Sequence, residues 1–338
     1  MWVEWMYGAV QPTFPLVHPL LWGRQALTVL AYHRIGEPER PSFDTYKPNV
    51  SATPAAFAEQ MAFVQSRFNV IGLAEVVAWL EEGRPLPPRP LLITFDDGYQ
   101  DNYDYAWPIL RQRNLPAVIF LATDYIDNDR PFFWDLVAYC FHHTRLERAT
   151  LPLVGRQEWG DAVTRTAVME NWLRALKGVR DDLKWEAVGQ APKQLEVYVP
   201  DGAFAGLCLT WEEVRAMAAG GMSMGAHTRS HAILRRVGEE RVREEIAGSK
   251  ERIEAETGRP VTAFAYPNGQ PGDFDEAHGR ILGEVGVKVA FTLRPGPARL
   301  AEVQRSPLTI RRVFVGYRDS LPRFVAKVLG LPRLVGRP

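Results

Sequence analysis

The sequence Leu-Leu-Ile-Thr-Phe-Asp-Asp-Gly at residues 91–98 joins a short apolar run to two adjacent carboxylates and a glycine. An apolar run of this length, bounded by the Pro-rich turn at 85–90, is typical of a strand that is buried on both faces of a parallel sheet. The carboxyl ends of parallel strands form the active-site face of α/β folds. We therefore expect Asp96 and Asp97 at the opening of such a face.

Strands and helices alternate along the chain on both sides of this stretch. Thr53 and Pro54 are a typical helix start, and Thr210 with Glu213 forms the capping box of another helix. Gly258 ends a long charged helix that begins near residue 239. Further strands are expected at 27–32, 117–121, 222–226, 261–265, 288–293 and 312–315. About seven such units predict a parallel α/β fold that closes, or nearly closes, into a (β/α) barrel. A doubly wound open sheet is the alternative.

Three segments do not follow the alternation. Residues 1–24 are rich in Trp and Pro and are expected to be an N-terminal extension, and residues 321–338 to be a C-terminal helix and tail. Within the barrel domain at 25–320, the segment at about 127–206 carries weak helical signals and many charges. We interpret 127–206 as an insertion that forms a lid or a side wall.

The overall composition excludes some classes of partner. The 338 residues include 46% hydrophobic and 24% charged residues, and the 40 basic side chains equal the 40 acidic ones. A net charge of zero gives no bulk attraction to nucleic acid. No run approaches the roughly 20 apolar residues of a membrane span, and no secretory signal is recognised. A cytoplasmic protein is the default expectation, with peripheral membrane contact through the aromatic residues of 1–24 left open. The sequence does not indicate an oligomeric state.

Neither cysteine belongs to a metal-binding pair. Cys140 and Cys208 are far apart in the sequence, so a cysteine-ligated zinc site is excluded. The two residues could form one disulfide or could both be small buried side chains.

Two further strands end in imidazoles. His33 follows the first strand, and His227 and His231 follow the fourth. One carboxylate and two imidazoles form a common catalytic metal set that leaves coordination positions open. If residues 227–231 form one helical turn, both rings lie on the same side. Because Asp96 and Asp97 are adjacent, one of them can be a ligand while the other is a general base. This constellation would hydrolyse an amide or an ester.

Three segments resemble the motifs of the polysaccharide deacetylase family. They are Thr-Phe-Asp-Asp-Gly-Tyr at 94–99, His-Thr-Arg-Ser-His at 227–231 and Phe-Ala-Tyr-Pro-Asn-Gly at 264–269. The resemblance extends over roughly residues 27–315. It implies a distorted seven-stranded (β/α) barrel and an enzyme that removes N-acetyl groups from an amino-sugar polysaccharide or glycan precursor.

The resemblance also implies a role for each motif residue. Asp96 would be the catalytic base. Asp97, His227 and His231 would hold one divalent metal ion, with zinc favoured and cobalt, nickel or iron as alternatives. The family's third motif usually has an Arg where this chain has Ala265 and a Tyr where it has Asn268. Arg311 or Arg312 could replace the missing arginine.

The usual late Leu-x-His motif, which supplies the general acid in this family, is not found. One branch, which resembles the poly-N-acetylglucosamine deacetylases, has a Tyr-His pair on the first strand, and Tyr32 with His33 matches that pair. We therefore expect His33 to protonate the leaving amine, with a packed strand-end residue as the alternative.

Aromatic side chains are candidates for binding the glycan. Tyr99, Tyr266 and Trp134 are the three that we select. Three other functions are weighed: hydrolysis of a small cyclic amide or ureide, an iron oxygenase with the same ligand set, and an inactive sugar-binding homologue. The predicted helices argue against the oxygenase, which usually has a β-sandwich, and the intact motif residues argue against an inactive homologue.

Overall fold

The computed structural model describes residues 2–23 and 25–331, with side chains from residue 12 onward in the first helix. Seven parallel strands form a closed barrel, because β1 pairs with both β5 and β13. In barrel order the strands are β1 (Ala26–Tyr32), β5 (Pro90–Phe95), β6 (Val118–Leu121), β9 (Ser223–Ala226), β10 (Ala263–Ala265), β11 (Val289–Pro295) and β13 (Ile310–Phe314). The expected seven-stranded barrel is confirmed, and the open sheet is wrong.

Two short strands extend the sheet beyond the barrel. β12 (Ala298–Arg299) pairs antiparallel with β1, and β4 (Asn69–Val70) pairs parallel with β5. β1 and β5 are buried at every position, which explains their uninterrupted apolar sequences. Their register places Tyr32 opposite Phe95, so the residues that follow the two strands, His33 and Asp96, leave the barrel at the same level.

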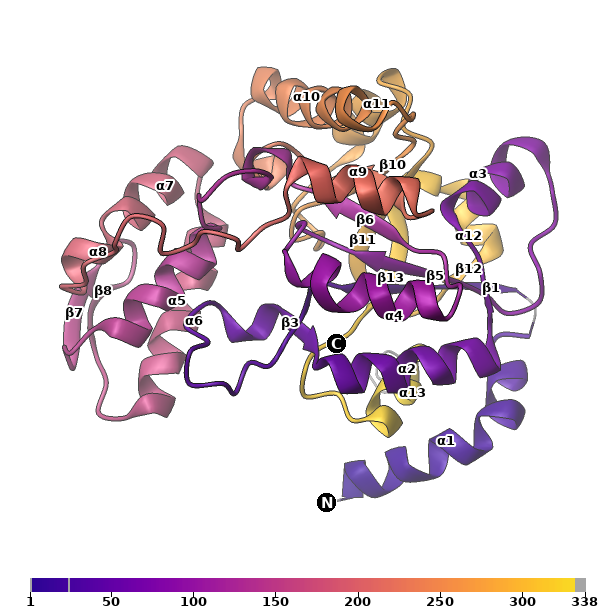
Figure 1. Cartoon of the computed structure of the whole chain (residues 1–338), viewed down its shortest axis with the longest axis horizontal. Coiled ribbons are helices and arrows are strands. Elements are labelled where there is room, and N and C mark those ends of the chain that lie inside the picture. Colours follow the sequence, from indigo (N-terminus) through magenta and orange to yellow (C-terminus); the bar gives the residue numbers. More distant parts are fainter. Residues whose placement is uncertain (1, 24, 332–338) are drawn as a thin grey trace.

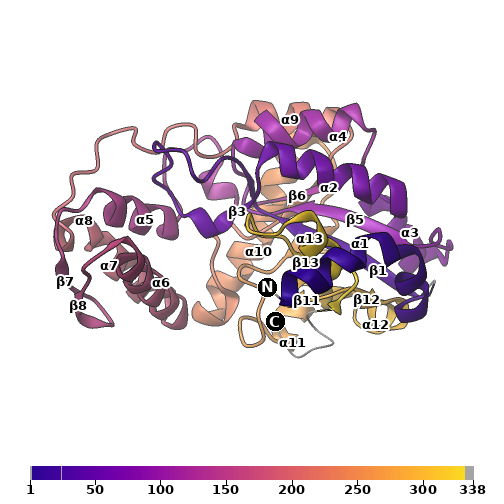
Figure 2. The ribbon, with the colours of Figure 1, turned by 90° about the horizontal axis from the view of Figure 1, so that it is seen from below.

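Helices surround the barrel (Figures 1 and 2). They are α2 (Pro54–Arg67), α3 (Leu73–Glu82), α4 (Trp107–Gln112), α9 (Trp211–Ala219), α10 (Glu239–Thr257), α11 (Glu276–Glu284), α12 (Leu300–Arg305) and α13 (Leu321–Val328). Thr53 accepts a hydrogen bond from the backbone of Ala56, and Thr210 with Glu213 makes the expected capping box. The helical segment between β5 and β6 is only partly regular. A π-helical turn over Asn102–Ala106 precedes α4, because Pro108 has no N–H to donate to the preceding turn.

The insertion forms a lobe beside the barrel, at the left of Figures 1 and 2. It contains α5 (Phe133–His143), the hairpin of β7 (Arg148–Leu151) and β8 (Gly155–Glu158), α6 (Ala162–Gly178), α7 (Asp181–Gly189) and α8 (Ala191–Gln194). The lobe has its own apolar core around the fully buried Trp172. Tyr99, from the end of β5, belongs to the same core and joins the lobe to the barrel. Cys140 and Cys208 are both buried free thiols, so they form no disulfide.

The N-terminal segment is a helix, α1 (Trp2–Leu21), although it contains three prolines. Phe14 is fully buried and packs edge-on against Phe63 and Phe68 of the α2 region. Burial of such side chains against the barrel compensates for the hydrogen bonds that the prolines remove. In the part of the chain that the structure describes, no helix combines the length and apolarity needed to cross a bilayer.

The close packing of β9 against β6 leads to a stability prediction. A Cβ atom on Gly225 would lie 2.4 Å from two ring carbons of Phe120. Gly225→Ala should therefore lower the free energy of unfolding by about 1–3 kcal/mol, the usual cost of overpacking. The matched control is Gly283→Ala in α11, where a Cβ would meet nothing within 4 Å. The control should be neutral or stabilising, by up to about 1 kcal/mol. Urea unfolding of both variants checks this, and equal stabilities would contradict it.

Candidate metal centre and active site

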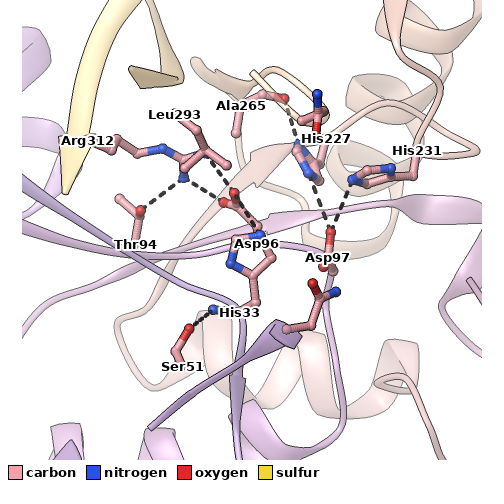
Figure 3. A network of polar contacts seen from close by, with 12 residues as sticks. His33, Ser51, Thr94, Asp96, Asp97, His227, His231, Ala265, Leu293 and Arg312 are labelled. Atoms are coloured by element: carbon pink, nitrogen blue, oxygen red, sulfur yellow. Dashed lines mark hydrogen bonds and ion pairs between the residues drawn. The ribbon is translucent and has the colours of Figure 1, made fainter. Parts of the chain in front are cut away.

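A pocket of about 400 Å³ opens at the carboxyl ends of the barrel strands. Residues from the ends of six barrel strands and from the insertion line it. They include His33, Asp96, Asp97, Trp134, Lys177, His227, His231, Asn268 and Phe314. The structure thus brings together all five of the catalytic and metal-binding residues that the sequence predicts (Figure 3).

Asp97, His227 and His231 form a group suited to a metal ion. Their ligand atoms all lie within 4.8 Å of one another. Oδ1 of Asp97 is 3.5 Å from Nε2 of His227 and 3.4 Å from Nε2 of His231, and both oxygens of Asp97 are buried without a hydrogen-bond partner among the described residues. A buried carboxylate without partners is costly. A divalent ion between these atoms would remove that cost, so the donor set fits the group that the sequence implies.

A backbone carbonyl orients His227. Nδ1 of His227 donates to the carbonyl of Ala265 at 2.7 Å. This contact leaves Nε2 free to face Asp97, as a metal-binding imidazole requires. Ala265 stands where the third motif of the family usually has an arginine, and here it is the last residue of β10. The ring of His231 packs edge-on against Trp134, with centroids 4.7 Å apart.

The turn that carries the two histidines is not helical, so the expected helical turn is wrong. Thr228 and His231 have φ values of 62° and 56°, in the left-handed region. The carboxylate of Glu245, on the buried face of α10, holds this turn. It accepts hydrogen bonds from the backbone N–H groups of Arg229 and Ser230 at 2.9 and 2.8 Å, and from the Ser230 hydroxyl at 2.5 Å.

Arg312 resolves the question of the missing arginine. Its guanidinium makes two hydrogen bonds of 2.7 Å to the two carboxylate oxygens of Asp96, and both side chains are almost fully buried. Arg311 instead pairs with Glu302 outside the pocket. Burial would raise the pKa of Asp96, but the charge and hydrogen bonds of Arg312 outweigh burial, and the pKa falls to about 2. Asp96 is therefore ionised at neutral pH.

The imidazole of His33 also lies close to Asp96. Its Nε2 is 3.9 Å from Oδ2 of Asp96, and its backbone N–H donates to the hydroxyl of Ser51 (Figure 3). Burial lowers the pKa of His33, against the opposing effect of Asp97 and Asp96. The ring reaches the pocket, so the structure leaves it free to contact a substrate.

The three selected aromatic residues have different positions. Trp134 lines the pocket and donates its indole N–H to the Tyr99 hydroxyl at 2.7 Å. Tyr99 is fully buried and donates in turn to the carboxylate of Asp135, so it supports Trp134 from behind. Tyr266 is also buried, stacked on Phe274, and is not among the pocket-lining residues. Trp134 is thus the one of the three that the structure places at the pocket.

The sequence did not single out several residues that build the site. Glu245 could have been noticed, because it is an acidic residue between the apolar positions Val242 and Ile246 of an amphipathic helix. Lys177 and Asn268 line the pocket from the insertion and from the third motif. No local pattern identifies Lys177, because its position depends on how the lobe packs against the barrel.

Comparisons with known proteins agree with the fold and the motifs. The family model described as polysaccharide deacetylase matches residues 83–290. Among curated proteins, the poly-beta-1,6-N-acetyl-D-glucosamine N-deacetylase of Escherichia coli K12 is 32% identical over 79 residues. These are 23% of this chain and 12% of that protein. The enzyme of the same name from Staphylococcus epidermidis is 34% identical over 79 residues, which cover 27% of its length. The chain therefore matches only a small part of either relative.

Solved structures share the whole architecture. The Streptococcus pyogenes deacetylase PplD in complex with acetate superposes with a TM-score of 0.60 and 16% identity, covering 90% of this chain and 98% of that one. IcaB from Ammonifex degensii gives a TM-score of 0.57 and 20% identity over 89% of this chain and 96% of that one. Identities this low establish the fold alone. Since the family model covers more than half of the sequence, the chain belongs to the polysaccharide deacetylase family.

Proposed function

We propose that the protein is a metal-dependent hydrolase that removes N-acetyl groups from an amino-sugar glycan. The observation that carries this proposal is the meeting of Asp97, His227 and His231 in one pocket, beside Asp96 held by Arg312. Membership of the deacetylase family and the names of the relatives from E. coli and S. epidermidis support it.

Asp97, His227 and His231 would hold a divalent ion, and zinc suits two imidazoles and a carboxylate. When bound, such an ion polarises the acetyl carbonyl and lowers the pKa of water at the site to about 7. The three protein ligands leave positions for water and for the acetamide oxygen.

Asp96 would take a proton from the attacking water. The two hydrogen bonds from Arg312 support this role, because they keep the carboxylate ionised and fixed in orientation. The water oxygen adds to the acetyl carbon, and the carbon–nitrogen bond then breaks. His33, whose Nε2 lies 3.9 Å from Oδ2 of Asp96, would pass on to the leaving amine the proton that Asp96 takes from the water. Acetate and a free amino sugar are the products. Trp134 would contribute apolar surface to the wall of the pocket.

Acetate release from acetylated chito-oligosaccharides tests the proposal. The wild-type protein should release acetate, a chelator should abolish release, and added zinc should restore it. Asp96→Asn should reduce turnover by roughly 10²–10⁴-fold, the usual contribution of a general base, while the protein still binds one metal ion per chain. Elemental analysis of the purified variant measures the metal. Activity that survives chelation with no bound metal would contradict the proposal.

His33→Ala should reduce turnover by roughly 10²-fold or more, because the leaving amine loses its proton donor. Metal content should stay at the wild-type level, since His33 is not in the ligand group. The matched control is His143→Ala, which removes an exposed histidine at the end of α5 in the lobe, where it pairs with Asp44. This variant should keep wild-type turnover. Loss of the metal in His33→Ala would make His33 a ligand instead of an acid.

Breaking the buried ion pair of Arg312 and Asp96 should lower the free energy of unfolding. Arg312→Met leaves a buried carboxylate without its partner, which costs about 3–5 kcal/mol. The double variant Arg312→Met with Asp96→Asn should recover most of this loss, because neither charge of the pair remains. Since the folded pKa of Asp96 lies below the usual 3.8, the wild-type pair contributes stability above about pH 3.8 and loses it as the pH falls towards 2. Urea unfolding at pH 7 compares the variants, and a double variant no more stable than the single one would contradict the pairing.

A further inference from the structure

Lys177 introduces a positive charge into the pocket. It lies in the last turn of α6, so it comes from the inserted lobe and not from the barrel. Its side chain is half-buried and lines the pocket together with Trp134 and the three residues proposed to bind the metal. In the described chain, no carboxylate lies within ion-pair distance of its ammonium group, whose one hydrogen bond to a side chain is to the amide oxygen of Asn268 at 3.2 Å.

The position of this ammonium group is fixed by its neighbours. Asn268 has a φ of 60°, and its amide nitrogen donates to the carboxylate of Asp273 at 2.6 Å. The same carboxylate accepts the backbone N–H of Gln270 at 2.8 Å. Asn268 is therefore held with its oxygen towards Lys177. Asn268 replaces the tyrosine that the third motif of the family usually has, so this departure has a local structural consequence.

With a divalent ion bound, the pocket would carry an excess of positive charge. Arg312 neutralises Asp96. Asp97 belongs to the proposed ligand group, where the two positive charges of a divalent ion would exceed the one negative charge of Asp97. Lys177 is the one lysine or arginine among the lining residues that the structure describes. The carboxylate of Asp273 also attracts this ammonium group, but it already accepts hydrogen bonds from Asn268 and Gln270. The ammonium group of Lys177, bound to a neutral amide, therefore keeps donors available for an anion.

We propose that Lys177 binds an anionic substituent, a carboxylate or a phosphate, on the same sugar ring as the acetamide that is hydrolysed. This inference rests on the proposed function and adds that, among N-acetylated amino sugars, anionic ones are the preferred substrates. Lys177 is then a specificity-determining residue, and the insertion supplies the part of the pocket that selects the substrate.

The test compares kcat/KM for three monosaccharides: neutral N-acetylglucosamine, its 1-phosphate, and N-acetylmuramic acid, which carries a carboxylate. The wild-type protein should prefer at least one of the two anions over the neutral sugar by roughly 10- to 100-fold, as expected for one charge-assisted contact. The anion that is preferred identifies phosphate or carboxylate as the group bound. Added salt should weaken the preference.

Lys177→Met should remove most of that preference, and Lys177→Arg should retain it. The control is Lys193→Met, which removes an exposed lysine from the same lobe outside the pocket and should keep the wild-type preference. Melting temperatures verify that all variants are folded. An equal loss of activity on neutral and anionic sugars in Lys177→Met would overturn the inference.

A neutral acetylated chito-oligosaccharide separates the two levels of the proposal. Acetate release from this oligomer without any preference for the anionic sugars would overturn the role of Lys177 and leave the deacetylase proposal standing. If the metal-loaded protein released no acetate from the oligomer or from any of the monosaccharides, the proposed function itself would fail, and this inference with it.

Discussion

Two adjacent buried carboxylates, Asp96 and Asp97, set the constraint on which the rest of the site depends. Both are almost completely excluded from solvent, and burying an unpaired charge costs several kcal/mol. The two side chains leave the end of β5 in different directions, so each needs its own source of positive charge. Arg312 reaches Asp96 from β13, and the imidazole turn after β9 faces Asp97. The closed barrel makes this possible, because it brings strand ends from distant parts of the sequence to one opening.

Local strain is concentrated where these charges meet. Asp97, Thr228 and His231 all have positive φ, a backbone conformation that is unfavourable for residues other than glycine. Such strain is typical of functional sites that the surrounding structure holds in place. Glu245 provides part of that hold by accepting two backbone N–H groups of the histidine turn. The departures in the third motif fit the same picture. Ala265 leaves its carbonyl to orient His227, while Arg312 replaces the missing arginine from another strand.

The sequence alone predicted the features of the fold and site that depend on local sequence pattern. The apolar runs, the caps at Thr53 and Thr210, and the polar residues at strand ends predicted the barrel and the meeting of the Asp96–Asp97 pair with His227 and His231. The resemblance to the deacetylase motifs then assigned Asp97, and not Asp96, to the ligand group. Long-range contacts were beyond reach. Arg312 pairs with Asp96 across 216 positions, and nothing local distinguishes it from Arg311. Burial of Tyr99 and Tyr266 follows from how the lobe and a loop pack, so their aromatic character alone could not place them.

Anomalous X-ray diffraction from crystals of the protein grown with zinc tests the central claim most directly. One strong zinc peak should lie between the carboxylate of Asp97 and the Nε2 atoms of His227 and His231, at about 2.0–2.2 Å from each. Asp96 and His33 should remain outside the coordination sphere. A peak elsewhere in the molecule with none in the pocket, or a site ligated by Asp96 in place of Asp97, would contradict the assignment of the two carboxylates.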